Sequence, residues 1–355
     1  MIEIDGSAFE GGGQMARTAL ALSTVLQKPF AMRSIRKGRK EPGLKAQHLE
    51  GVNALKRLCS AQAEGAELGS TELDFYPGKI QPGKYAIEIG TAGSITLLLQ
   101  NLLLPAIFAG KKCVFTISGG TDVSWSPSVD YFSNVLLPHL SAYATFECKL
   151  LERGYYPKGQ GKVELSIIPK LEKERLFSGN VPRINQIHRG NLLQIKGVSH
   201  ASIDLSNAQV AERQAKAAEM LLAKLKCPIQ IRHEYRKTAS TGSGITLWAR
   251  FGEEGEIDGK EVILGADALG ERGKKAEDVE NQAAMELLAE IESQACVDRH
   301  LSDQLIPFLA LFGGKYLASQ VTEHAKANIY VCEQFFGKCV ESDGMVFRGV
   351  RNEVR

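Results

Sequence analysis

The sequence predicts an α/β protein of the α+β type, in which a large domain of repeated α/β units carries a smaller inserted α/β domain. Three observations predict this architecture. Strand-like and helix-like apolar periodicities alternate along the 355 residues. Strand, glycine turn and helix follow one another at least twice, near residues 11–13 and 90–93. Between residues 180 and 265, strand patterns dominate, which indicates a second domain.

The elements of the large domain follow in order. An alternating run over 1–5 predicts a strand, and apolar residues at helical spacing over 14–27 predict the helix behind the first glycine turn. Further strands are expected at 29–35, 73–76, 85–89 and 112–118, and further helices at 46–61, 95–109 and 127–143. Two more strands are expected within 144–168, on either side of a glycine-rich turn.

The inserted stretch shows strand patterns at 192–196, 229–235 and 245–251 and one helix at 209–225. A long helix over 275–295 then carries the chain back. We therefore assign residues 1–182 and 294–355 to a discontinuous catalytic domain and 183–293 to the insertion. The most apolar run, 95–109, is short for a bilayer span and contains Gln100, Asn101 and Pro105, so we expect a buried helix and no membrane contact.

Composition narrows the possible functions. The net charge is only +2, so any nucleic-acid contact must come from a local basic patch. The seven cysteines are scattered, odd in number and without a C-x-x-C pair. This pattern indicates reduced thiols and not a disulfide framework or a zinc site. The acidic, glycine-rich start of the chain is unlike a signal peptide. We expect a cytoplasmic protein.

The first glycine turn, Gly11 to Gly13, is a candidate phosphate site. Free N–H groups and the dipole of the following helix favour an anion at such a turn. Glu10 is placed to bind a divalent cation that bridges phosphates, and Arg17 lies one turn into the helix. On the triple glycine alone, a tight connection with a surface glutamate is the simpler interpretation.

Two basic segments add to this picture. Residues 28–45 carry seven positive charges against one glutamate, and arginines in such a turn suit bidentate phosphate recognition, although a solvated loop explains the charges equally well. Residues 153–163 place three cations and two tyrosines around glycines and a proline, which a β-turn alone does not explain.

Several catalytic motifs are absent from the sequence. There is no H-E-x-x-H, no G-x-x-x-x-G-K-[ST] and no G-x-S-x-G, so zinc hydrolases, P-loop proteins and α/β-hydrolases gain no support. His324 lies in a helical pattern, where a histidine by itself is more often structural than catalytic.

Together these segments resemble the RNA 3′-terminal phosphate cyclases over essentially the whole chain. Residues 153–163 fit the family's signature, except that Gln160 stands where many members have glycine. The order of the other motifs also resembles the family: E-G-G-G-Q at 10–14, S-I-R-K-G-R at 34–39, G-T-A-G-S at 90–94, S-G-G-T-D at 118–122 and S-D-Q-L at 302–305.

The resemblance implies the fold described above and an activity. A histidine attacks the α-phosphate of ATP, forming histidine–AMP and releasing pyrophosphate. AMP passes to the RNA 3′-phosphate, and the neighbouring 2′-OH then attacks that phosphorus, so that a 2′,3′-cyclic phosphate forms and AMP leaves. A terminal phosphate needs such activation, neutral imidazole is a competent nucleophile, and the last step requires RNA.

The resemblance also implies roles for single residues. His324 matches the nucleophile and Glu10 the ligand of Mg²⁺ or Mn²⁺. The matches to ATP- and phosphate-binding positions are Arg17, Gln100, Pro127, His300, Asp303 and Gln304, with Pro127 packing against adenine. The matches to RNA- and phosphate-binding positions are Arg36, Arg39 and Gln47. His300 departs from the family, because relatives carry a tyrosine that stacks on adenine there and an imidazole offers less area.

The nearest alternative is the cyclase-like ribosome-biogenesis protein, a non-enzymatic RNA-processing factor with the same fold that lacks the nucleophilic histidine. His324, Glu10 and Arg17 favour the enzyme, a ligase that uses ATP and RNA with a 3′-terminal phosphate. A related phosphate- or enolpyruvyl-transfer enzyme and a plain RNA-binding module are further alternatives. Whether the protein is a monomer or a homodimer does not follow from the sequence.

Overall fold

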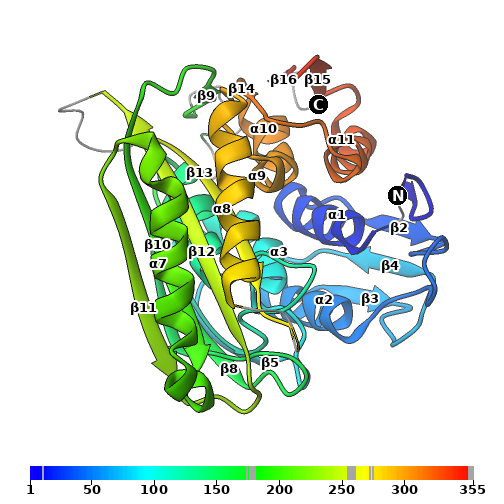
Figure 1. Ribbon diagram of the computed structural model, residues 1–355. Coiled ribbons are helices and arrows are strands. Elements are labelled where there is room, and N and C mark those ends of the chain that lie inside the picture. The colour runs from blue at the N-terminus through cyan, green and yellow to red at the C-terminus, as the bar shows by residue number, and fades with distance from the viewer. Residues whose placement is uncertain are drawn as a thin grey trace.

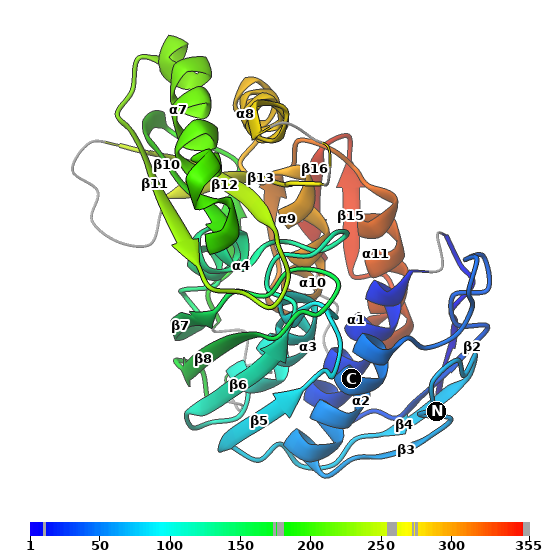
Figure 2. The ribbon, with the colours of Figure 1, turned by 60° about the horizontal axis from the view of Figure 1, so that its bottom comes forward.

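The computed structural model describes residues 1–9, 12–172, 175, 181–253, 261–271, 273 and 276–350. Within these ranges the chain forms four four-stranded sheets covered by helices, which confirms the α/β class (Figures 1 and 2). No helix among these residues is both long and apolar enough to cross a membrane.

The first sheet has the order β1-β2-β4-β3, with β1 and β2 parallel and the other neighbours antiparallel. Its elements are β1 (Ile2–Asp5), α1 (Gly13–Leu26), β2 (Phe30–Arg33), α2 (Ala46–Cys59), β3 (Gln62–Glu64) and β4 (Leu73–Tyr76). The helices expected at 14–27 and 46–61 are therefore present.

The second sheet repeats this connectivity in the order β5-β6-β8-β7, again with one parallel pair. Its elements are β5 (Lys84–Glu88), α3 (Ile95–Ile107), β6 (Cys113–Gly119), α4 (Val129–Tyr131), a π-helical turn (Phe132–Leu136), α5 (Leu137–His139), β7 (Ala144–Glu152) and β8 (Gly161–Pro169). The predicted continuous helix over 127–143 is instead interrupted. Pro138 has no N–H to donate to the preceding turn, and the π-helical turn stands directly before it.

The third sheet, β15-β16-β14-β9, has the same pattern of one parallel and two antiparallel pairs. Its elements are β9 (Ile184–Gln186), α9 (Arg299–Gln304), α10 (Ile306–Phe312), β14 (Gly314–Leu317), α11 (Glu323–Phe336), β15 (Val340–Asp343) and β16 (Val346–Gly349). The repeat that two glycine turns indicated thus occurs three times among the described residues, as three sheets that each contain one parallel and two antiparallel pairs.

The fourth sheet, β11-β10-β12-β13, stands in the chain between β9 and α9. Its elements are β10 (Asn191–Ser202), α7 (Val210–Leu222), β11 (Ile229–Arg236), β12 (Ser243–Gly252), β13 (Val262–Leu269) and α8 (Ala276–Glu292). Helices α7 and α8 lie side by side on one face of this sheet (Figure 1). The domain boundaries at 182/183 and 293/294 stay a prediction. They assign β9 to the insertion, although β9 pairs with β14, a strand of the predicted catalytic domain.

Two hydrophobic cores correspond to these layers. One contains the fourth sheet's face toward α7 and α8, and the larger one fills the space between the other three sheets and their helices. Val198, Trp248 and Ile263 project from the opposite face of the fourth sheet into the larger core. Helix α1 contacts α2, α3 and α11, so residues at its start lie where the repeated units converge (Figure 2).

Candidate active site

Arg17, Gln100, Asp303 and Gln304 line one pocket, although they lie on three different helices, α1, α3 and α9. The Gln100 amide nitrogen Nε2 donates to Gln304 Oε1 at 2.9 Å, which joins α3 to α9 across this pocket. The packing of α1 against α3 brings the first two residues together, and nothing in the linear spacing of 17, 100 and 303 reveals it.

Arg17 and Asp303 are an electrostatic pair inside the pocket. Burial lowers the pKa of Arg17 to about 10, although the charge of Asp303 opposes this shift. Burial also raises the pKa of Asp303 to about 7, with Arg17 acting in the opposite direction. At neutral pH the guanidinium therefore keeps its charge in a poorly hydrated site, where an electrostatic interaction with a phosphate is stronger than in water.

The start of α9 is fixed by the buried Asp298. Its carboxylate accepts hydrogen bonds from the backbone N–H groups of His300 and Leu301, an N-cap arrangement. It also accepts from the Tyr131 hydroxyl at 2.6 Å and from the Gly265 N–H at 2.9 Å. Asp298 thus ties α9, which carries three predicted site residues, to helix α4 and to β13 of the fourth sheet.

His324 lies in the first turn of α11 with its side chain exposed. The Thr322 hydroxyl caps this helix by accepting from the Ala325 N–H at 3.0 Å. One turn after His324, the buried Asn328 donates to the Asp303 backbone oxygen at 2.9 Å and accepts from the Thr18 hydroxyl at 2.8 Å. Because residues four apart share a helix face, His324 lies on the side of α11 that faces the pocket of Arg17 and Asp303.

Arg17 also lines a second, smaller hollow together with Gln47 and His48 of α2. His48 Nδ1 accepts from the Lys45 N–H at 3.0 Å, so its neutral ring carries the proton on Nε2. Burial, reinforced by the charges of Arg17 and Arg36, lowers the pKa of His48 to about 3. A Cβ at Gly13 would lie 2.0 Å from His48 Nε2, so only glycine allows this approach of α1 and α2.

Arg36 and Arg39 lie in the loop that follows β2. The Arg36 guanidinium donates to the backbone oxygens of Glu41 and Gly43, both at 2.9 Å, and so organises this loop. Burial and the charge of Arg39 lower the pKa of Arg36, and Arg36 in turn acts on His48. The predicted RNA-binding residues Arg36 and Gln47 therefore both lie next to His48.

Pro127 and His300 are connected through Asp267. The N–H of Ser128, the residue after Pro127, donates to Asp267 Oδ2 at 2.8 Å. Burial raises the pKa of Asp267, whereas the hydrogen bonds of Ser128 and the charge of His300 lower it. The His300 ring is exposed and meets the edge of Tyr131, and the Gln304 amide donates to the His300 oxygen at 2.7 Å, which links this group to the first pocket.

Glu10, the predicted metal ligand, lies outside the described residues. Within the described ranges, one group of three possible ligands, Asp122, Asp130 and His200, has its ligand atoms within 4.8 Å of one another. The buried Arg153 guanidinium already donates to Asp122 at 3.0 Å and to Asp130 at 2.6 Å. A divalent cation there would meet this positive charge at contact distance, so the cluster fits an internal ion network rather than a metal.

Three polar residues that line the pocket of Arg17 were not predicted from the sequence, namely Gln14, Thr18 and Asn328. The buried Gln14 Nε2 has no hydrogen-bond partner among the described residues. For Asn328 a signal existed, because it lies four residues after the predicted nucleophile on a helical pattern. Gln14 belongs to the glycine motif but carries no charge that would single it out.

Several known proteins resemble this chain over almost its whole length. A model of the family "RNA 3′-terminal phosphate cyclase" matches residues 8–341. A protein of that name from Pyrococcus furiosus is 47% identical over 356 residues, covering 100% of this chain and 98% of its own length. The protein of that name from Archaeoglobus fulgidus is 46% identical, over 97% of this chain and 98% of its own length. The one from Methanosarcina acetivorans is 44% identical, over 94% of this chain and 95% of its own length.

Proposed function

The chain belongs to the RNA 3′-terminal phosphate cyclase family, and we propose that it uses ATP to convert an RNA 3′-phosphate into a 2′,3′-cyclic phosphate through a covalent intermediate on His324. The observation that carries the proposal is the convergence of Arg17, Gln100, Asp303 and Gln304 in one pocket beside the helix face of His324. The relatives are named as the enzyme, which favours catalysis over a non-enzymatic RNA-processing role.

In the first step, a ring nitrogen of His324 attacks the α-phosphorus of ATP, the bond to the bridging oxygen breaks, and pyrophosphate leaves. The exposed imidazole at the start of α11 is accessible for such an attack. The free N–H groups and the dipole at this helix end favour the phosphate charge. Asn328 holds the helix against α1 and α9, so it positions the nucleophile over the pocket.

Within the pocket, Arg17 is the cation that offsets charge developing on the phosphate oxygens. Its pKa of about 10 leaves it protonated at neutral pH, and the charge of Asp303 favours this protonated form. The linked amides of Gln100 and Gln304 supply further hydrogen-bond donors and acceptors. The adenine would lie toward Pro127 and His300, with less stacking area than a tyrosine gives.

In the second step, a phosphate oxygen of the RNA end attacks the phosphorus of histidine–AMP, and the bond from that phosphorus to the His324 nitrogen breaks. In the third step, the neighbouring 2′-OH attacks the terminal phosphorus and loses its proton to solvent, and AMP leaves as the bond to its bridging oxygen breaks. Arg36, Arg39 and Gln47 bind the RNA phosphate in this proposal. The buried His48 is neutral although the charges of Arg17 and Arg36 act on it, so it offers neither arginine an anionic partner. Asp303, with a pKa of about 7, is only partly ionised at neutral pH and offsets the charge of Arg17 in part, which supports phosphate binding there. Glu10 would hold the Mg²⁺ or Mn²⁺ that accompanies ATP.

The test is covalent labelling with ³²P in the α-position of ATP and magnesium or manganese, without RNA. We expect an acid-labile, alkali-stable label on the wild type and none on His324→Ala, and RNA with a 3′-phosphate should discharge the label. His139→Ala is the matched control, because His139 bonds the Ile263 backbone oxygen and lies outside the site. A well-folded wild type that takes no label with either metal would exclude the proposed mechanism.

A further inference from the structure

A third cavity, of about 610 Å³, lies between β7 and β11, two strands that each pair on one side only within the part of the chain that the structure describes. This volume is in the range of ligand pockets, about 300–1,000 Å³. The helical segment from Val129 to His139 separates it from the first pocket: Ser133, Asn134 and Leu137 line the cavity, and Leu136 lines the pocket of Arg17. We call this cavity the β7–β11 groove.

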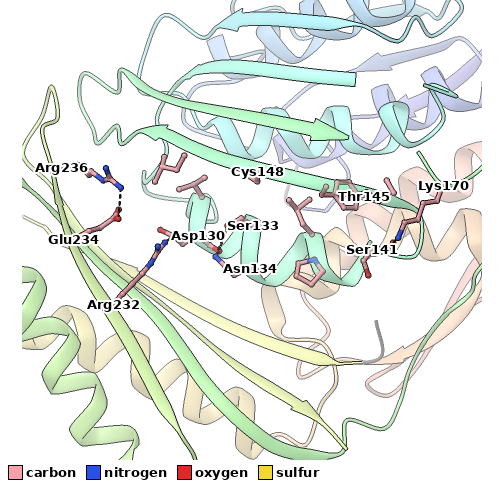
Figure 3. A pocket seen from close by; sticks show the side chains of 16 residues that line it. Asp130, Ser133, Asn134, Ser141, Thr145, Cys148, Lys170, Arg232, Glu234 and Arg236 are labelled. Carbon is pink, nitrogen blue, oxygen red and sulfur yellow. Dashed lines mark hydrogen bonds and ion pairs between the residues drawn. The ribbon is translucent and has the colours of Figure 1, made fainter. Parts of the chain in front are cut away.

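Cationic side chains stand at both ends of the β7–β11 groove. Arg232 and Arg236 project from β11, and Lys170 follows β8 at the other end, as Figure 3 shows. The two arginine side chains are 66% and 54% exposed. Alternate residues of a strand share a face, so Arg232, Glu234 and Arg236 form one row toward the groove, spaced about 13 Å from end to end.

A buried ion network holds this row in place. Arg153 is fully buried and donates to Asp130 at 2.6 Å and to Glu234 at 2.8 Å. Each of these carboxylates also pairs with one exposed arginine: Asp130 with Arg232 at 3.8 Å and Glu234 with Arg236 at 3.2 Å. With Asp122, which also pairs with Arg153, the network holds three arginines and three carboxylates and is neutral as a whole. Its carboxylates are buried or nearly so, whereas Arg232 and Arg236 are exposed, so the groups that the network presents to solvent are cationic.

The rest of the lining is apolar on one side and uncharged polar on the other. Phe146, Cys148 and Leu150 of β7 are half-buried and form one wall. Ser133 and Asn134 lie between the two cationic ends in Figure 3. A groove with a positive rim and an aromatic, apolar wall is the combination that binds single-stranded nucleic acid, with phosphates on the cations and bases against the apolar side.

We propose that the β7–β11 groove binds the single-stranded RNA upstream of the reactive 3′ end. This inference rests on the proposed function, because it names where the body of the same substrate lies. A peptide added to the edge of β7 or β11 is the competing occupant, but its backbone would gain nothing from exposed cations at both ends, whereas every nucleotide of an RNA strand carries a phosphate. The helical segment from Val129 to His139 contributes lining residues to both the groove and the first pocket, so the two sites lie on either side of one short segment.

The test compares binding of fluorescent 3′-phosphate RNAs of about 4 and about 16 nucleotides as a function of salt. In Arg232→Ala/Arg236→Ala, we expect affinity for the long RNA to fall on the order of tenfold and the salt slope to become shallower by about 1.4. Affinity for the short RNA and covalent labelling by ATP should not change. Arg213→Ala is the matched control, since Arg213 is an exposed arginine of α7 paired with Glu277 away from the groove.

Arg232→Lys/Arg236→Lys keeps both charges and should keep the salt slope. The proposal is overturned if the alanine pair binds the long RNA like the wild type, if the wild type binds both lengths equally, or if the lysine pair loses as much slope as the alanine pair. If the wild type takes no covalent label but shows the expected length dependence, the proposed mechanism fails and the groove assignment stands.

Discussion

Replacing Arg153 with methionine should lower the free energy of unfolding by about 3–5 kcal/mol, the cost of removing one partner from a buried ion pair. Arg153 pairs with three carboxylates, of which those of Asp122 and Asp130 are 0% and 6% exposed. Burial disfavours the guanidinium charge, but Asp122 and Asp130 outweigh this and hold the pKa of Arg153 well above its usual value. Methionine retains much of the apolar volume, so the loss comes mainly from the carboxylates. Asp122 is left without a counter-charge, and Asp130 keeps only the exposed Arg232 at 3.8 Å.

The assay is urea unfolding followed by tryptophan fluorescence. Trp248 on β12 is 7% exposed and reports on the sheet that the network anchors, whereas Trp125 is 99% exposed and changes little. Arg213→Met is the matched control and should cost at most about 1 kcal/mol, because its ion pair with Glu277 is exposed.

A second variant separates charge from shape. In Arg153→Met/Asp122→Asn/Asp130→Asn the uncompensated charges are gone, so most of the lost stability should return. If Arg153→Met unfolds within about 1 kcal/mol of the wild type with an unchanged urea dependence, the network does not stabilise the fold and the reasoning is refuted.

Three further predictions concern the active site. Burial raises the pKa of Asp303 from its usual value of 3.8 to about 7 in the folded protein, so the contribution of Asp303 to stability falls as pH rises between these values. Asp303→Asn should therefore gain stability relative to the wild type from acid to neutral pH, as read from urea midpoints. A parallel pH dependence in both proteins would contradict this. Asn328→Ala should lower the free energy of unfolding by about 1–3 kcal/mol and slow the labelling of His324, because it leaves the Thr18 hydroxyl without its acceptor. Equal labelling rates in the variant and the wild type would show that Asn328 does not position α11. Arg36→Ala should speed amide exchange in the loop up to Gly43, while Arg36→Lys should restore part of the protection, and unchanged exchange in both would remove its role in ordering the loop.

The sequence determined the local elements and the family. Apolar periodicity located α1, α2 and α3 to within a few residues, because each helix buries one stripe of side chains in the core. The glycine turns and arginine-rich segments identified the family before any contact was known. The interruption between Val129 and His139 was less predictable, since the pattern of apolar residues there is still helical.

The tertiary structure alone decided which residues meet. Arg17, Gln100 and Asp303 share a pocket because α1, α3 and α9 pack together. Asp130, Arg153 and Glu234 form a network from three segments, each of which by itself reads as an ordinary charged residue. Hydrophobic patterning is a property of short windows of sequence, whereas burial, and with it the strength of charge–charge interactions, depends on neighbours hundreds of residues away.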